Sequence, residues 1–366
     1  MAKHVAKPKH DPVKTGIKIV LIILAVILVL LALMILFLSV PEYKPADRED
    51  LTLEGKASAG KIKIGEKVKV MSWNIGYCAL GDNADFFMDG GKMVNTADDD
   101  RVLENIANII VATEREKPDL ILYQEVDRSS SRSHRENEVY YFTQRYSGFT
   151  SSFANNFKVL FLPYPIPPIG KVDSGLLTFS SFEVKSAERV QLPIPFAWPV
   201  RMANLKRCLN IQRLPVEGSS KELVLVNLHL EAYDDGEGKA AQTEMLRQIL
   251  VSEAEKGNYV IAGGDFNQIF STADKAAYPA QPGKWAPGEI DVSVFPGSWG
   301  FLMDSSVPSC RSLDQPYTGA VKDGFQYYLI DGFIVSDNVT VSSFRNLDLD
   351  FANSDHNPAV LEFVLK

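Results

Sequence analysis

The chain has 366 residues, of which 46% are hydrophobic and 23% are charged, with a formal net charge of −8 and three cysteines. This composition is that of a globular protein and excludes a disordered chain, a collagen and a disulfide-rich scaffold. The charge is unevenly distributed: residues 1–18 carry +4 and residues 19–40 carry no charge, which leaves −12 for residues 41–366. The sequence therefore predicts a basic stub, an apolar segment and an acidic folded part.

Residues 19–40 contain a single polar residue, Ser39. As a helix these 22 residues span ~33 Å, close to the ~30 Å hydrocarbon thickness of a bilayer. A buried core helix would have a polar face, and a cleaved signal peptide would have a shorter apolar region that ends in small residues rather than at Pro41. The sequence predicts an uncleaved signal anchor that binds the lipid bilayer through residues 19–40.

Charge on either side of this segment predicts its orientation. Lysines precede it within residues 1–18, and mainly acidic residues follow it. The positive-inside rule then places the stub in the cytoplasm. We expect a single-pass protein of the cell membrane whose large domain is extracytoplasmic.

After the anchor, residues 41–66 mix charges, Gly and Pro and predict a linker or a peripheral arm. From residue 67 onward, apolar runs typical of buried strands alternate with a few amphipathic stretches typical of helices. This alternation predicts one α/β domain at 67–366, with stacked sheets and outer helices. Strands are expected at 68–75, 120–126, 157–162, 174–180, 205–214, 222–230, 258–263, 329–336 and 358–364, and helices at 98–116 and 239–256.

Polar side chains occur where the predicted apolar strands meet loops, the place where open α/β sheets keep their sites. A single Asp at a strand end is typical of a cap or a turn. Six such junctions in one chain are harder to explain by capping alone. The three cysteines lack metal-ligand spacing and therefore suggest neither a zinc site nor a disulfide framework. The junctions supply Asn74, Glu125, His229, Asp265, Asn267, Asp331, Asp355 and His356.

These residue types support hydrolysis of a phosphate ester. Carboxylate and amide oxygens such as those of Glu125 and Asn74 suit a hard cation, Mg²⁺ or Mn²⁺. An Asp–His pair orients an imidazole and supports its protonated form. A second histidine and an asparagine can donate hydrogen bonds to the charge that builds on phosphoryl oxygens.

At these residues the sequence resembles the endonuclease/exonuclease/phosphatase superfamily, which includes deoxyribonuclease I, abasic-site endonucleases, sphingomyelinases and inositol polyphosphate 5-phosphatases. The resemblance implies a four-layer α/β/β/α sandwich and metal-dependent phosphoester hydrolysis. The matching segments occur in the family's order and cover residues 68–366. They are SWNIG at 72–76, KPDLILYQEVD at 117–127, KRCLNIQRL at 206–214, LVNLHLEA at 225–232, GGDFN at 263–267, IDGFIVS at 330–336 and SDHNP at 354–358.

The resemblance also implies roles for the individual residues. Glu125 is expected to be the principal metal ligand, with Asn74 beside it and Asp355 as a further ligand. His356 resembles the catalytic histidine, oriented by Asp331. Asp265 resembles the carboxylate that positions or deprotonates the attacking water. Asn267 resembles its phosphate-binding neighbour, and His229 resembles the histidine that stabilises the phosphoryl oxygens. Either Asp265 or His356 is expected to be the general base.

Several features narrow the substrate. Ile269 stands where inositol 5-phosphatases place an arginine, which disfavours that subfamily. The −12 of the domain disfavours a nuclease, because nonspecific nucleic-acid binding normally uses basic surfaces. The basic loop at 129–135 predicts either a phosphate clamp through Arg132 or Arg135, or a solvated loop.

Two proline-rich apolar segments, 161–170 and 192–200, are too dense in proline for central strands. They predict loops or edges that form either an accessory flap packed on the domain or an apolar rim for a lipid or bilayer surface. The residues that they would present are Tyr164, Ile166, Ile169, Phe196 and Trp198.

The favoured hypothesis is a membrane-anchored phosphodiesterase of phospholipid headgroups, close in character to the sphingomyelinase-like or membrane-associated members of the family. The alternatives are an extracytoplasmic endonuclease or exonuclease, and a membrane-tethered binding protein that retains the fold without catalysis. The intact set of site residues argues against the last alternative.

Overall fold

The apolar segment forms helix α1, Pro12–Ser39, in the computed structural model, which describes residues 11–234, 236–318 and 324–366. The helix begins earlier than the expected residue 19, because Asp11 accepts hydrogen bonds from the backbone N–H groups of Val13 and Lys14 and Pro12 occupies the first turn. None of its residues is buried, and it is long and apolar enough to cross a membrane. Lys3, Lys7 and Lys9 of the predicted basic stub lie outside the described residues.

The domain, which comprises Tyr43–Lys366, contains two seven-stranded sheets. The first has the order β17-β18-β3-β4-β6-β5-β2 and the second the order β1-β7-β8-β9-β10-β16-β13. The strands of the first sheet are β17 (Val339–Asn346), β18 (Ala359–Leu365), β3 (Lys67–Asn74), β4 (Leu120–Asp127), β6 (Gly170–Ser180), β5 (Thr150–Leu162) and β2 (Glu54–Gly55). Those of the second are β1 (Arg48–Asp50), β7 (Ser186–Gln191), β8 (Cys208–Pro215), β9 (Glu222–His229), β10 (Tyr259–Asp265), β16 (Asp331–Val335) and β13 (Gly300–Leu302).

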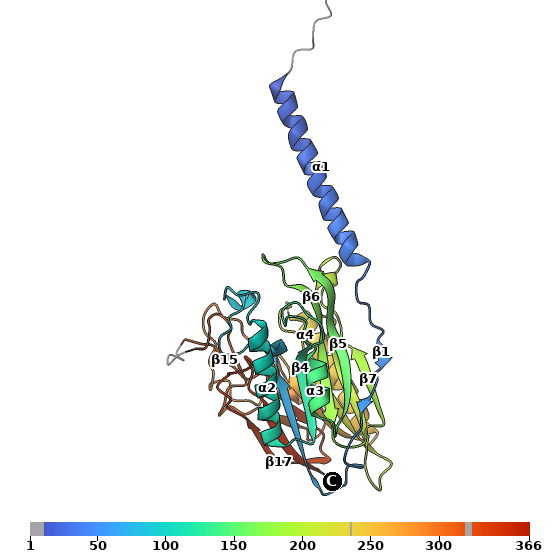
Figure 1. Ribbon diagram of the computed structural model, residues 1–366. Coiled ribbons are helices and arrows are strands. Elements are labelled where there is room, and N and C mark those ends of the chain that lie inside the picture. Colours follow the sequence, from blue (N-terminus) through green and yellow to red (C-terminus); the bar gives the residue numbers. More distant parts are fainter. Residues whose placement is uncertain (1–10, 235, 319–323) are drawn as a thin grey trace, which may run out of the picture. The chain divides into compact units, whose positions relative to one another are not determined.

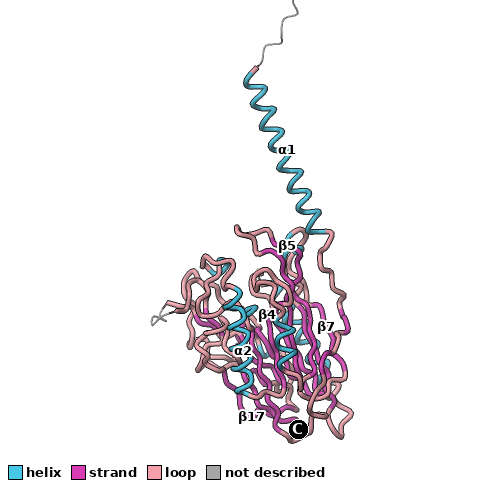
Figure 2. The backbone as a smooth tube through the Cα atoms, in the orientation of Figure 1, coloured by secondary structure: helices cyan, strands magenta, loops and turns pink. Residues whose placement is uncertain are grey.

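Helices cover the outer face of each sheet, as the ribbon and tube views show for α2 (Asp99–Glu116) (Figures 1 and 2). Alternating side chains of one strand serve two cores: in β3, Met71 packs outward with α2 and α3 (Glu138–Arg145), whereas Val70 packs between the sheets. On the far side, Leu246 and Leu250 of α4 (Glu237–Glu255) pack on the outer face of the second sheet. The predicted four-layer α/β/β/α sandwich is therefore confirmed.

Several elements were not predicted. Helix α3, β7 and the edge strand β17 lack a clear apolar pattern, and β5 begins at Thr150 instead of residue 157. The first residues of β5 are polar. One of them, Ser152, faces the second sheet and donates a hydrogen bond to Asn210 Oδ1 (2.9 Å). Polar inward-facing residues of this kind hide a strand from a search for apolar runs.

From Tyr43 on, segment 41–66 is part of the domain. Its strand β1 pairs with β7 and its strand β2 pairs with β5, so that it adds an edge to each sheet. Ile62 is fully buried and forms a bridge with Val216. From Tyr43 on, the segment therefore lies along the sandwich as an arm, the second of the two alternatives, linker or peripheral arm, that the sequence left open.

The two sheets pack so closely at Gly263 that a larger side chain would not fit there. A Cβ at this position would lie 2.4 Å from the Phe333 ring and 3.0 Å from Leu122. We predict that Gly263→Ala lowers the free energy of unfolding by about 1–3 kcal/mol, because the added methyl overpacks the inter-sheet core. Urea unfolding of the full chain in detergent, followed by tryptophan fluorescence, measures this. Gly60→Ala is the control, because nothing lies within 4 Å of a Cβ there; equal midpoints for the two variants would contradict the prediction.

Candidate active site

Three site residues form one row across the second sheet. In β9 and β10, which are parallel, His229 is the register partner of Asp265. In β10 and β16, which are antiparallel, Asp265 is the register partner of Asp331. Asp331 therefore begins its strand, whereas the sequence pattern suggested that it ended one. The antiparallel direction of β16 still brings it to the carboxyl end of β10.

The first sheet supplies the other side of the site. Asn74 ends β3, and Glu125 lies in β4 where its pairing with β6 shifts register between Tyr123 and Val126. Glu125 has a φ of 54°, so this bulge turns its side chain away from the regular pleat. Asp355 and His356 precede β18 rather than lying within it.

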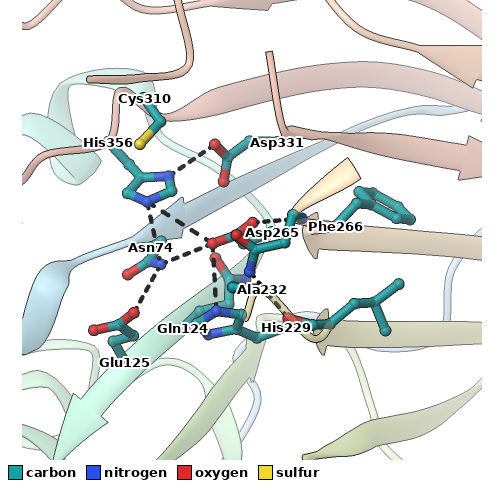
Figure 3. A network of polar contacts seen from close by, with 12 residues as sticks. Asn74, Gln124, Glu125, His229, Ala232, Asp265, Phe266, Cys310, Asp331 and His356 are labelled. Atoms are coloured by element: carbon teal, nitrogen blue, oxygen red, sulfur yellow. Dashed lines mark hydrogen bonds and ion pairs between the residues drawn. The ribbon is translucent and has the colours of Figure 1, made fainter. Parts of the chain in front are cut away.

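Asn74 joins the two sheets at the centre of the site (Figure 3). Its side-chain nitrogen donates to Asp265 Oδ2 at 3.1 Å and to Glu125 Oε1 at 3.3 Å, and it lies 3.4 Å from His356 Nε2. Its side-chain oxygen accepts the backbone N–H of Gly76 at 3.1 Å. In this geometry Asn74 is a donor that links the carboxylates; its role as an oxygen ligand of a metal stays a prediction.

His356 and Asp331 form a buried pair. His356 Nδ1 lies 2.8 Å from Asp331 Oδ2, which leaves Nε2 directed toward Asn74 and Asp265. Burial by itself lowers the pKa of His356, but the neighbouring Cys310, Asp331 and Asp355 outweigh it and hold the pKa well above its usual value.

Asp265 lies between two histidines. Its Oδ2 is 3.4 Å from His229 Nε2 and 3.8 Å from His356 Nε2. Burial, together with repulsion from Asp331, raises the pKa of Asp265 to about 7. Burial, with the nearby charges of Arg207 and His356, holds the pKa of His229 well below its usual value, so that this imidazole is neutral.

Asn267 follows Asp265 with a φ of 50° and is buried. Its backbone N–H donates to Asp265 Oδ1 at 2.8 Å, and its side-chain nitrogen donates to the carbonyl of Leu230 at 2.9 Å. In this structure Asn267 orients the Asp265 carboxylate and ties β10 to the loop after β9. Phosphate binding by its side chain stays a prediction.

The donor set fits a hard divalent cation. Burial raises the pKa of Asp355 to about 6, with the nearby Glu125 as a further cause. Asp331 Oδ1 is buried and has no hydrogen-bond partner among the described residues. The ligand atoms of Asp265, Asp331 and His356 lie within 4.8 Å of one another, a grouping that could hold a divalent cation, and metal binding by Glu125 and Asp355 stays a prediction.

The basic loop at 129–135 does not form the predicted clamp through Arg132. Its guanidinium makes two hydrogen bonds of 3.0 Å to the buried carboxylate of Asp127 and stacks 3.6 Å above the Tyr77 ring. Arg132 is thus a structural group under the site, neither a free phosphate ligand nor a solvated residue. Arg135 is exposed, as the alternative of a solvated loop predicted.

Sequence reasoning missed the hydroxyl groups that hold these residues. Ser354 Oγ donates to the backbone carbonyl of Asn74 (2.7 Å) and accepts the N–H of His356 (3.2 Å). Ser309 Oγ accepts the N–H of Asp331 (3.1 Å). Ser354 could have been found, because it precedes Asp355 in the segment SDHNP, whereas Ser309 lies far from any motif.

Comparison with other proteins agrees with this geometry. Residues 71–356 match the Endonuclease/Exonuclease/phosphatase family. No curated protein sequence matches the chain. Among solved structures, truncated TDP2 from Caenorhabditis elegans is similar with a TM-score of 0.52 and 17% identity over 82% of this chain and 98% of that one.

Two further similar structures are proteins described as endonuclease/exonuclease/phosphatase. The endonuclease/exonuclease/phosphatase from Beutenbergia cavernae has a TM-score of 0.51 and 15% identity over 82% of this chain and 72% of that one. The one from Bacteroides vulgatus has a TM-score of 0.51 and 13% identity over 82% of this chain and all of that one. At these identities the likeness concerns the fold.

A two-sheet α/β sandwich with helices on its outer faces, which gathers acidic and imidazole groups at one end of its central strands, defines the class of fold. The match over most of its length assigns this chain to one family within that class. The protein belongs to the Endonuclease/Exonuclease/phosphatase family.

The pKa of Asp265 predicts a pH dependence. Since ionised Asp265 increases as pH rises through about 7, kcat/KM for a phosphodiester should rise with pH in this region. Raising the Mg²⁺ concentration should move the midpoint to lower pH, because a cation favours the ionised carboxylates. Asp265→Asn should remove the transition together with most activity. A wild-type profile that is flat across about pH 5–9 would contradict this role.

Proposed function

We propose that this protein is a divalent-metal-dependent phosphodiesterase, anchored in the cell membrane by the segment 19–40 with its domain outside the cytoplasm. The observation that carries the proposal is a pair of histidines beside one buried carboxylate whose pKa values are shifted in opposite directions. The pKa of His356, which lies beside Asp331, is well above its usual value, that of His229 is well below it, and the pKa of Asp265 between them is raised by burial to about 7. Titratable groups whose pKa values are pushed apart are the mark of acid–base assignments in enzymes.

The chain's own residues divide the chemistry between them. Asp265 accepts the proton of the attacking water, because it is ionised at a pH where His356 still holds its proton. His356 donates from Nε2 to the charge that develops on the phosphoryl group, and Asp331 keeps its ring in place through Nδ1. When bound by Glu125 and Asp355, Mg²⁺ or Mn²⁺ would neutralise phosphoryl charge and lower the pKa of water.

Exposed apolar residues support a phospholipid headgroup as substrate. The proline-rich loops expose Tyr164 (71%), Ile166 (94%) and Trp198 (54%), and Tyr164 packs 5.9 Å from Phe87 of η2 (Phe87–Asp89). Asp89 in turn accepts a hydrogen bond of 3.2 Å from Tyr233, four residues after His229. The apolar rim thus connects to the loops next to the site, which suits an enzyme that works at a lipid surface.

The test uses the purified full chain with Mg²⁺, with Mn²⁺ or with chelator. The substrates are vesicles of several phospholipids, plasmid DNA and soluble phosphodiesters. We expect metal-dependent release of a phosphorylated headgroup, and a loss of about 10²–10⁴-fold in kcat for His356→Ala and Glu125→Gln, because each removes charge stabilisation or general acid–base chemistry. Glu114→Gln is the matched control, since this carboxylate on α2 pairs with Arg145 on the surface.

Two outcomes would replace the proposal. Nicking of plasmid DNA without attack on any vesicle would make the protein a nuclease. Absence of hydrolysis, with metal binding equal in wild type and Glu125→Gln, would favour a membrane-tethered binding protein that retains the fold.

A further inference from the structure

A pocket of about 200 Å³ lies beside the site and has no part in the chemistry described above. Ile269, two residues after Asn267, and Leu329, two residues before Asp331, line it. Two residues of extended chain cover ~7 Å, so these lining residues lie within about that distance along the chain from the site residues. It is small against the ~300–1,000 Å³ of pockets for drug-sized ligands, which limits its occupant to a compact group.

Aromatic side chains form much of the wall. The rings of Trp285 and Tyr328 lie 5.1 Å apart at 75°, and those of Tyr278 and Tyr327 lie 6.1 Å apart at 57°. Within each pair the two rings pack against one another, so ring faces and edges at several inclinations bound the pocket, which suits a compact group.

The pocket is physically joined to the catalytic residues. Trp285 Nε1 donates to the carbonyl of Ala232 at 3.0 Å, three residues after His229. Tyr328 pairs with Cys310, and Cys310 forms a bridge with His356. Ala232 and Cys310 both appear beside the site residues in Figure 3. A ligand in the pocket would therefore lie next to a phosphate held by His356.

Charge around the pocket favours a cation. The tyrosine hydroxyls are occupied by protein groups: Tyr278 donates to the Ser305 carbonyl and Tyr328 to the Trp285 carbonyl, at 3.1 and 3.2 Å. Of the charged lining groups, Lys275 forms an ion pair with Glu289, which leaves the carboxylate of Asp274 in excess. Aromatic faces with a surplus negative charge attract quaternary ammonium groups through cation–π contacts.

We propose that this aromatic pocket binds the trimethylammonium group of a phosphocholine ester whose phosphate occupies the catalytic site. The proposal rests on the proposed phosphodiesterase function and adds the headgroup that the site selects. The shared chemistry is that of phosphocholine, whether it belongs to a lipid or to a soluble ester.

Binding is measured first, without hydrolysis. Calorimetry on the full chain in a maltoside detergent compares choline with dimethylbutanol, its uncharged carbon isostere. We expect choline to bind about tenfold more tightly, and Trp285→Leu to weaken choline binding about tenfold. Asp274→Asn, at an exposed position, should weaken it a few-fold without disturbing packing. Tyr140→Leu is the matched control, because this exposed tyrosine lies on α3, outside the pocket lining.

Hydrolysis is measured second. The substrates are the p-nitrophenyl esters of phosphocholine and of methyl phosphate, and Trp285→Leu should raise KM for the choline ester about tenfold more than KM for the methyl ester. Phosphatidylcholine vesicles and glycerophosphocholine then distinguish a lipid from a soluble source.

Equal binding of choline and its isostere, or tighter binding of a nucleoside monophosphate through Trp285, would overturn the pocket assignment. A failure to hydrolyse any diester would overturn the proposed function alone, because choline binding is read without turnover.

Discussion

The site depends on the distance between the two sheets, because neither sheet holds a complete set of groups. Asn74 belongs to the first sheet and Asp265 to the second, and a single hydrogen bond of 3.1 Å joins them. Two positions before Asp265, a Cβ on Gly263 would meet the Phe333 ring of the neighbouring strand and Leu122 of the first sheet, so this glycine lets the two sheets pack closely just below the site. Any change in this packing would separate the residues that act together.

Polar contacts reinforce this spacing in a part of the inter-sheet layer that the apolar core does not fill. Gln124 of β4 donates to Asn227 of β9 at 2.8 Å, and Gln212 of β8 donates to Ser152 of β5 at 2.9 Å. Such buried hydrogen bonds are directional and lose free energy when their partners shift, so they fix the register of one sheet on the other more tightly than apolar side chains do. Because Glu125 directly follows Gln124, the same hydrogen bond also restrains the position of Glu125.

What the sequence could predict follows the same division. Apolar runs and the polar residues at their ends were sufficient to identify the central strands β3, β4, β9 and β10 and to predict stacked sheets with outer helices, whereas the four-layer arrangement was predicted from the family resemblance. They could not identify β5 at its true length, because Ser151 and Ser152 are polar and yet buried. Arg132 illustrates the opposite case, a charged loop residue that was predicted to bind phosphate or to be solvated. Its charge is instead neutralised inside the protein by Asp127, and no local sequence pattern indicates that pairing. The direction of β16 could not be predicted from the local sequence either, although the structure places its residue Asp331 beside His356.

The acidic and imidazole groups of the candidate site and the aromatic pocket belong to different parts of this fold. The acid–base groups sit on strand ends whose positions are fixed by two sheets, and their pKa values follow from burial in that framework. The aromatic pocket is built instead from the chain around Tyr278 and Trp285 and from the short strand β15 (Tyr327–Tyr328), which lies outside both large sheets. The pocket nevertheless contacts the site, because Trp285 donates a hydrogen bond to the Ala232 carbonyl and Tyr328 pairs with Cys310, which forms a bridge with His356. A fold arranged in this way can keep one hydrolytic site and alter the alcohol or headgroup that it accepts.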